Sequence, residues 1–112
     1  MQTRDHVDAD GLHIVELSGE VDLHHATELR EVLTAHAEAR RPALVIDLSG
    51  VTYIDSSGLA TLIEYVQRAF GFEGRFALGG VSERLRTVFD IARLDQVFAI
   101  FPTLAEAKAA LK

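Results

Sequence analysis

The chain contains no cysteine and only two prolines, and no apolar run in it approaches the length of a membrane span. The missing thiols exclude a disulfide framework, thiolate chemistry and a zinc site built on cysteine. The N-terminal residues 1–6 also lack the apolar core of a signal peptide. We therefore expect a protein of a reducing compartment, the cytoplasm, that has no membrane partner.

Positive charge is scarce as well. Seventeen Asp and Glu residues stand against eleven Lys and Arg, which gives a formal net charge of −6. This balance repels nucleic acid phosphates and anionic lipid head groups, so the expected partner is a protein and not a nucleic acid. The length of 112 residues suits one domain, expected over residues 1–112.

Short apolar runs alternate with helical patterns along the whole chain, and no linker or repeat interrupts them. A hairpin is expected around the turn at residues 9–11, and Asp22, Ser82 and Thr103 are placed to cap helices. The pattern predicts an α/β fold with four helices and a mostly parallel sheet of four to five strands, including an antiparallel N-terminal edge strand. Strands are expected at 7–8, 12–17, 43–48, 75–78 and 97–101, and helices at 23–37, 57–70, 83–92 and 104–111.

The sequence Tyr-Ile-Asp-Ser-Ser-Gly at residues 53–58 lies between a buried strand and an amphipathic helix. The first turn of a helix has free N–H groups and a partial positive charge, which would partly compensate a phosphoryl group on a serine. One serine is explained as a helix cap, but two are not. A nucleophile elbow around Ser56 would need Gly two residues earlier, where Ile54 stands.

Two polar turns are expected at one edge of the sheet, because the carboxyl ends of parallel strands meet there. They are residues 19–22 and 55–58. Glu20, Asp22 and Asp55 would make this edge acidic around the two serine hydroxyls. Such an edge would suit a basic or metal-bearing partner.

A phospho-receiver domain is a rival of a different class with the same size and layout, since Asp47 stands near the end of a buried strand. A receiver needs paired acidic residues that hold Mg²⁺ and a Lys after its last strand, whereas Lys108 and Lys112, the only lysines, belong to the terminal helix. His24 and His25 are adjacent on a helix and diverge by about 100°, which is wrong for joint chelation. No metal or cofactor is expected.

Three segments, residues 18–22, 45–51 and 53–59, resemble the STAS domain family in its small bacterial form, the anti-sigma factor antagonists. The resemblance covers almost the whole chain. It implies a regulatory protein, not an enzyme, that binds an anti-sigma factor which is also a serine kinase, and so frees a sigma factor. The kinase would phosphorylate Ser56, a metal-dependent serine phosphatase would reverse this, and Asp22 would match an acidic residue near the phosphorylation site. The alternative within the family is a scaffold that is not switched.

The outer face of the helix at 57–70 is expected to border the partner interface, with Tyr65 as the main anchor. Free protein is expected to be a monomer or weak dimer. Two departures from relatives are Arg93, where a Gly commonly ends the helix, and Phe72, which we expect to fold back onto the sheet edge. The expected contact residues are Glu20, Asp22, Asp55, Ser57, Gly58, Thr61 and Tyr65.

Overall fold

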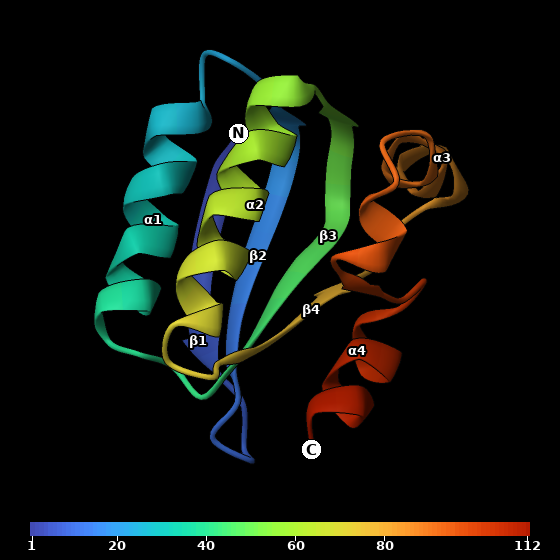
Figure 1. The fold of residues 1–112 in the computed structure, drawn as a ribbon. Helices are drawn as coiled ribbons and strands as arrows, with labels where there is room; N and C mark the ends of the chain where they lie inside the picture. The colour runs from blue at the N-terminus through green and yellow to red at the C-terminus, as the bar shows by residue number, and fades with distance from the viewer.

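The computed structural model describes all residues, Met1–Lys112. One five-stranded sheet has the order β1-β2-β3-β4-β5, in which β1 is antiparallel to β2 and the other neighbours are parallel. Four α-helices accompany it (Figure 1), so the predicted fold class is confirmed. The elements are β1 (Gln2–Val7), β2 (His13–Val21), α1 (Ala26–Glu38), β3 (Ala43–Ile54), α2 (Ser56–Phe70), β4 (Arg75–Gly79), α3 (Glu83–Ile91), a 3₁₀ turn (Leu94–Gln96), β5 (Ala99–Ile100) and α4 (Leu104–Leu111).

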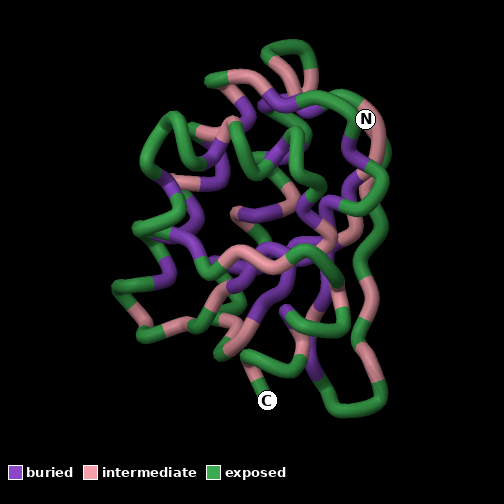
Figure 2. Tube along the Cα trace, turned by 90° about the vertical axis from the view of Figure 1, so that its right-hand side faces the viewer, coloured by how far each residue is buried: buried purple, intermediate pink, exposed green.

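Helices cover both faces of the sheet. α1 and α2 lie side by side on one face and α4 covers part of the other (Figure 1). Along β3, Leu44 and Ile46 belong to the large hydrophobic cluster under α1 and α2, whereas Val45 belongs to the smaller cluster under α4. The continuous apolar run of β3 is therefore explained by burial on two sides, and Figure 2 shows the buried residues running through the interior.

α3 lies beyond β3 and β4 in Figure 1, and its buried residues Leu85 and Phe89 join the large cluster. Its Phe89 is fully buried, and its ring lies edge-on to Phe98, with 5.7 Å between the centroids. Phe76 continues this aromatic row, 5.5 Å from Phe98. The row connects α3 with the core beneath α2.

Several strand boundaries differ from the prediction. β1 spans Gln2–Val7 and not residues 7–8, and β2 continues to Val21 and does not end at residue 17. β3 continues to Ile54 because its last residues pair with Glu20 and Val21 of β2, across a register shift. The last strand is only Ala99–Ile100, since residues Leu94–Gln96 form a 3₁₀ turn immediately before it. The structure contains no helix that is both long and apolar enough to cross a membrane.

The helix caps test the local predictions. Ser82 and Thr103 cap α3 and α4, as predicted, by accepting bonds from the N–H groups of Leu85 and Glu106. The expected cap at Asp22 is wrong, because α1 begins at Ala26 and its N-cap position is His25, which makes no side-chain cap bond.

The two departures from relatives also have a structural outcome. Arg93 adopts the left-handed conformation, with φ 60°, that usually favours Gly. Phe72 packs against the large cluster, with the guanidinium of Arg40 5.6 Å from its ring centroid. The ring is thus turned inward, as expected.

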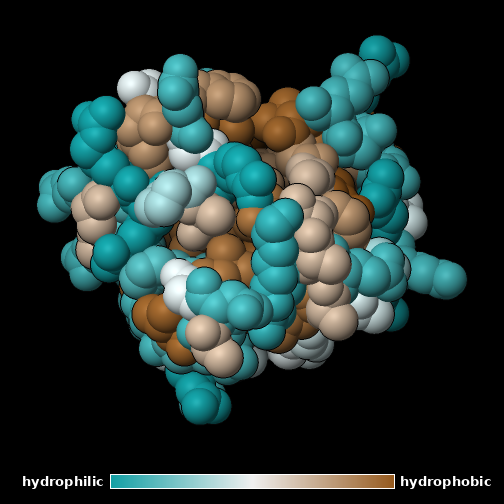
Figure 3. Space-filling view, turned by 90° about the horizontal axis from the view of Figure 1, so that it is seen from below, coloured by the Kyte–Doolittle hydropathy of each residue, from teal (hydrophilic) through white to brown (hydrophobic).

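The amino ends of the parallel strands form the lower end of the molecule in Figure 1. Seen from below, polar side chains ring this end and apolar atoms show between them (Figure 3). Lys108 and Lys112 both pair here with carboxylates of the β1–β2 turn, Asp8 and Asp10. The two lysines are therefore tied to the end opposite the serine turn.

Candidate functional site at the serine turn

The carboxyl ends of β2 and β3 bring the two polar turns together, as predicted. Glu20 pairs with Tyr53 and Val21 with Ile54 across the two strands. The N–H of Asp55 then donates to the carbonyl of Val21 at 3.2 Å. Residues 19–22 and 55–58 consequently share one edge of the molecule, at the top of Figure 1.

Asp55 binds both turns with one carboxylate. Its Oδ1 accepts hydrogen bonds from the N–H groups of Ser57 (2.9 Å) and Gly58 (3.1 Å) and thereby caps α2. Its Oδ2 accepts a bond from the N–H of Leu23 (3.1 Å) in the β2–α1 turn. The helix cap is therefore the aspartate and neither of the serines, which corrects the expectation that one serine caps the helix.

Gly58 lets α2 approach the end of β2. A Cβ at this position would lie 2.5 Å from the carbonyl oxygen of Val21 and 2.9 Å from Cγ1 of Ile54. The first of these is a backbone atom that already accepts the bond from Asp55 N–H, so it cannot easily move aside. Position 58 therefore requires Gly because the first turn of α2 packs directly against the backbone at the end of β2.

The two serines are not equivalent. Ser56 is exposed as the first residue of α2, and its hydroxyl makes no hydrogen bond within the chain. Ser57 is half-buried, and its carbonyl accepts a bond from Oγ1 of Thr61 at 2.9 Å. Of the two serines, Ser56 is therefore the one that is open to solvent.

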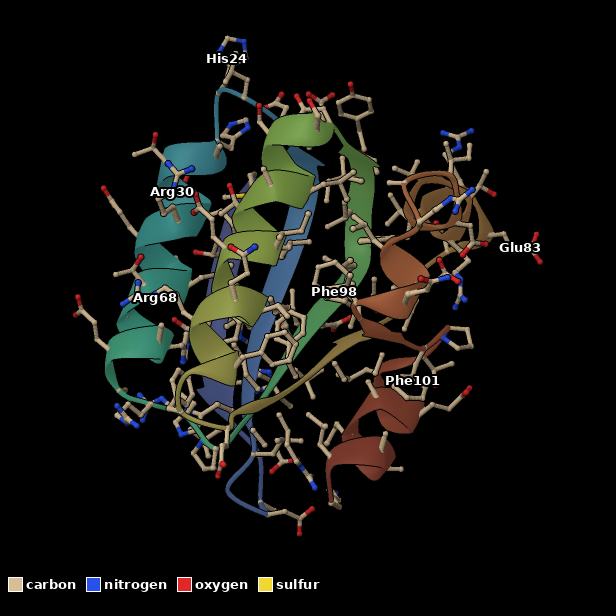
Figure 4. The ribbon with its side chains drawn as sticks, viewed as in Figure 1. His24, Arg30, Arg68, Glu83, Phe98 and Phe101 are labelled. Atoms are coloured by element: carbon tan, nitrogen blue, oxygen red, sulfur yellow. The ribbon has the colours of Figure 1, made fainter.

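Two of the three carboxylates near Ser56, those of Asp22 and Asp55, already have hydrogen-bond partners within the chain. Oδ1 of Asp22 lies 2.7 Å from Nδ1 of His25. Desolvation opposes ionisation of Asp22, but the bond to His25 and the charges of His25 and His24 outweigh it and hold the pKa of Asp22 below its ordinary value. Asp55 is occupied by backbone N–H groups, so Glu20 is the one exposed carboxylate of the three. His24 projects from the outermost part of the β2–α1 turn (Figure 4).

The predicted anchor on α2 is wrong, because Tyr65 is only 2% exposed and Thr61 only 1%. The Tyr65 ring packs against Phe76, with 5.2 Å between centroids, and burial raises the pKa of its phenol to about 12. α1 packs beside α2 and covers this side of the helix, which periodicity alone did not reveal.

Thr61 and Tyr65 instead line a shallow groove between α1 and α2. An ion pair crosses it, with Nε of Arg30 2.8 Å from Oε2 of Glu64. Figure 4 shows Arg30 and Arg68 on this side of the molecule. The groove residues are Arg30, Leu33, Thr34, Thr61, Glu64, Tyr65, Gln67 and Arg68.

Two apolar residues that the sequence argument missed lie at the serine turn. Leu23 is 70% exposed and Tyr53 is 52% exposed. The N–H of Leu23 donates to the Asp55 carboxylate, and Tyr53 lies two residues before Asp55 in the chain. A signal was present in the sequence: Leu23 is apolar inside a polar turn, and Tyr53 alternates with the buried Ile54.

Asp47, the residue considered as a receiver aspartate, is nearly buried at 8% exposure. Its Oδ1 accepts bonds from both the N–H and the hydroxyl of Ser49, at 3.0 and 2.5 Å. It is thus engaged within the fold, whereas Ser56 is open to solvent.

The fold and this site define a small α/β module that presents the exposed Ser56 at the N-terminus of α2. The family model described as "STAS domain" matches residues 2–107. The chain belongs to the STAS domain family and, within it, to the group of anti-sigma factor antagonists.

Individual relatives agree with this assignment. The anti-sigma-B factor antagonist of Listeria monocytogenes is 29% identical over 96 residues, which are 86% of this chain and 79% of the relative. The crystal structure of an anti-sigma factor antagonist from Mycobacterium paratuberculosis is 34% identical, with a TM-score of 0.90, and the match covers 98% of this chain and 92% of that one. The Bacillus protein SpoIIAA in its phosphorylated form shares the fold, at 19% identity and a TM-score of 0.76, with 99% and 100% covered.

Proposed function

We propose that this protein binds an anti-sigma factor that is also a serine kinase, that this binding frees a sigma factor, and that phosphorylation of Ser56 ends the binding. The observation that carries the proposal is the exposed Ser56 hydroxyl at the start of α2, with the capping role taken by Asp55. The names of the relatives, anti-sigma factor antagonists, support the choice of partner.

In this proposal the kinase, and not this protein, catalyses the phosphorylation. The kinase transfers the γ-phosphoryl group of ATP to Oγ of Ser56, and the serine proton leaves to a base on the kinase. Ser56 makes no hydrogen bond to a histidine or carboxylate that could act as its own base. In this proposal the protein is a substrate and a ligand without catalytic activity or cofactor, and a metal-dependent serine phosphatase restores the hydroxyl.

The fold is expected to tolerate the modification. Phosphoserine carries about −1.5 to −2 charges at neutral pH. The N-terminus of α2 offers a dipole interaction of roughly 0.3–1 kcal/mol, although the N–H groups of Ser57 and Gly58 are already bound to Asp55. SpoIIAA, which shares the fold, has been solved in both phosphorylated and unphosphorylated forms. This supports a switch that acts at the surface and leaves the fold intact.

The test combines mapping and binding. The purified chain is incubated with candidate serine-kinase anti-sigma factors, Mg²⁺ and ATP, and the modified residue is located by mass spectrometry. We expect a single phosphate on Ser56, its absence in Ser56→Ala, and its retention in the matched control Ser57→Ala. Calorimetric titration of the kinase should show at least a hundredfold weaker binding of the phosphoprotein, since like charges brought into an interface cost several kcal/mol and each ~1.4 kcal/mol is tenfold.

Far-UV circular dichroism of each form controls for unfolding. Equal affinities of the phosphorylated and unmodified proteins, with both folded, would refute the switch. The remaining function would then be the unswitched STAS scaffold.

A further inference from the structure

Six large apolar side chains are markedly exposed, and they are not evenly placed. Two of them lie close to Ser56 along the backbone: Leu23 in the β2–α1 turn, which is bonded to Asp55, and Tyr53 at the end of β3. Single exposed apolar residues are ordinary on protein surfaces, but two that border one modifiable serine form a cluster of the kind found at interaction sites. The other four are Val7, Phe70, Ile91 and Val97.

Both side chains stand on backbone that is held in place. The N–H of Leu23 donates to Asp55 at 3.1 Å, and the turn that carries Leu23 is closed by the bond from His25 N–H to the Asp22 carbonyl at 3.0 Å. Tyr53 lies within β3 and pairs with Glu20 of β2. Because the backbone is already ordered, a partner that covers these side chains pays only for their own rotamer freedom and not for ordering a loop.

We infer that Leu23 and Tyr53 are the anchor residues of the partner interface, and that they insert into an apolar socket on the serine-kinase anti-sigma factor, with a basic side chain of that partner against Glu20. This inference rests on the proposed function. Tyrosine is among the residues most enriched at binding hot spots. Glu20 adds the charge complement, since it is exposed, has no ion pair in the chain and is the strand partner of Tyr53.

The same arrangement explains why a phosphate on Ser56 would act so strongly. Ser56 directly follows Asp55, to which the Leu23 turn is bonded, so a socket that closes over both anchors also removes water from the serine. A neutral hydroxyl tolerates this, whereas a phosphate dianion loses its hydration. One basic residue already paired with Glu20 cannot compensate two further negative charges.

The experiment compares anchor and control variants in calorimetric titrations with the kinase. Leu23→Ala and Tyr53→Ala are each expected to raise the Kd about thirtyfold or more, the size of a hot-spot truncation, while Tyr53→Phe keeps the ring and binds within about threefold of wild type. The matched controls are Phe70→Ala and Ile91→Ala, since these residues are 71% and 79% exposed and lie outside the serine turn. Both should bind like wild type.

Hydroxyl-radical footprinting of the wild-type complex gives a second measurement that does not depend on any variant. Leu23 and Tyr53 should be protected on binding, and Phe70 should not. Circular dichroism and thermal melts check the fold of each variant, which the high exposure of Leu23 and Tyr53 should leave intact.

The outcomes separate the two proposals. If the kinase binds wild type and phosphorylates Ser56, but both anchor variants bind as tightly as Phe70→Ala, the anchors are wrong and the proposed function stands. If both anchor variants weaken binding but Ser56→Asp does not, the anchors are supported and the switch is refuted. Failure of the wild-type protein to bind any serine-kinase anti-sigma factor overturns both.

Discussion

Replacing Asp55 with Ala should destabilise the fold strongly, because this one carboxylate accepts three backbone hydrogen bonds from two turns. Loss of a helix N-cap costs about 0.5–2 kcal/mol. Loss of the bond from Leu23 N–H to a charged acceptor costs about 1.5–3 kcal/mol. Allowing for some replacement by water, we expect the free energy of unfolding to fall by about 2–4 kcal/mol. Each kcal/mol lowers the Tm by roughly 4–8 °C in a domain of about 100 residues, so the Tm should fall by roughly 10–30 °C.

Two further variants divide this loss into its parts. Asp55→Asn keeps a carbonyl oxygen that can cap α2, but its amide cannot accept from both turns, so the bond from Leu23 should be lost alone. Ser57→Ala removes a neighbouring side chain that makes no hydrogen bond, and should change stability by less than about 0.5 kcal/mol. Urea denaturation of the three variants measures each value. An Asp55→Ala protein within about 0.5 kcal/mol of wild type would refute the view that this carboxylate holds the turns together.

Two other predictions concern the core and the pH dependence. Tyr65→Ala should lower the free energy of unfolding by about 3–5 kcal/mol in urea titrations, because it leaves a cavity against Phe76. Tyr65→Phe should preserve both stability and kinase binding. A Tyr65→Ala protein that is as stable as wild type but fails to bind would contradict the structural role of this residue. Burial, followed by the charges of Arg41 and His36, lowers the pKa of His13 below its ordinary 6.5, with Asp5 opposing. Because the pKa of His13 is lower in the folded than in the unfolded state, protonation of His13 favours the unfolded chain. The free energy of unfolding is therefore undiminished above about pH 6.5 and decreases as the pH falls through the folded-state pKa of His13. His13→Gln should therefore show a smaller fall in Tm between pH 7 and pH 5 than wild type. The same fall in Tm in both proteins would contradict this prediction.

The local pattern of the sequence was sufficient for the architecture and for the position of the serine turn between β3 and α2. The apolar run at the start of β3 has no polar alternation, and only a strand buried on both sides of a sheet satisfies that run. The Asp-Ser-Ser-Gly turn likewise marks the end of a strand and the start of a helix. Ser82 and Thr103 were identified correctly as caps because capping at those positions involves only the next few residues.

The errors occurred where the outcome depends on a second element far away in the chain. Whether Asp55 or a serine caps α2 depends on the β2–α1 turn, which supplies the third donor to the carboxylate. Asp22 is the exception, because its partner His25 is only three residues away. α1 begins at Ala26, so the N-cap position is His25 and Asp22 lies outside it.

The site surface was decided by tertiary packing alone. Helical periodicity places Thr61 and Tyr65 at the border of the apolar face of α2, but it does not say that α1 lies beside that border and buries both. Conversely, hydrophobicity favours burial of Leu23 and Tyr53, yet no element covers the edge at which they stand. Hydrophobic periodicity indicates which face of an element is apolar. Which other element covers that face, if any does, is decided only by how the helices pack on the sheet.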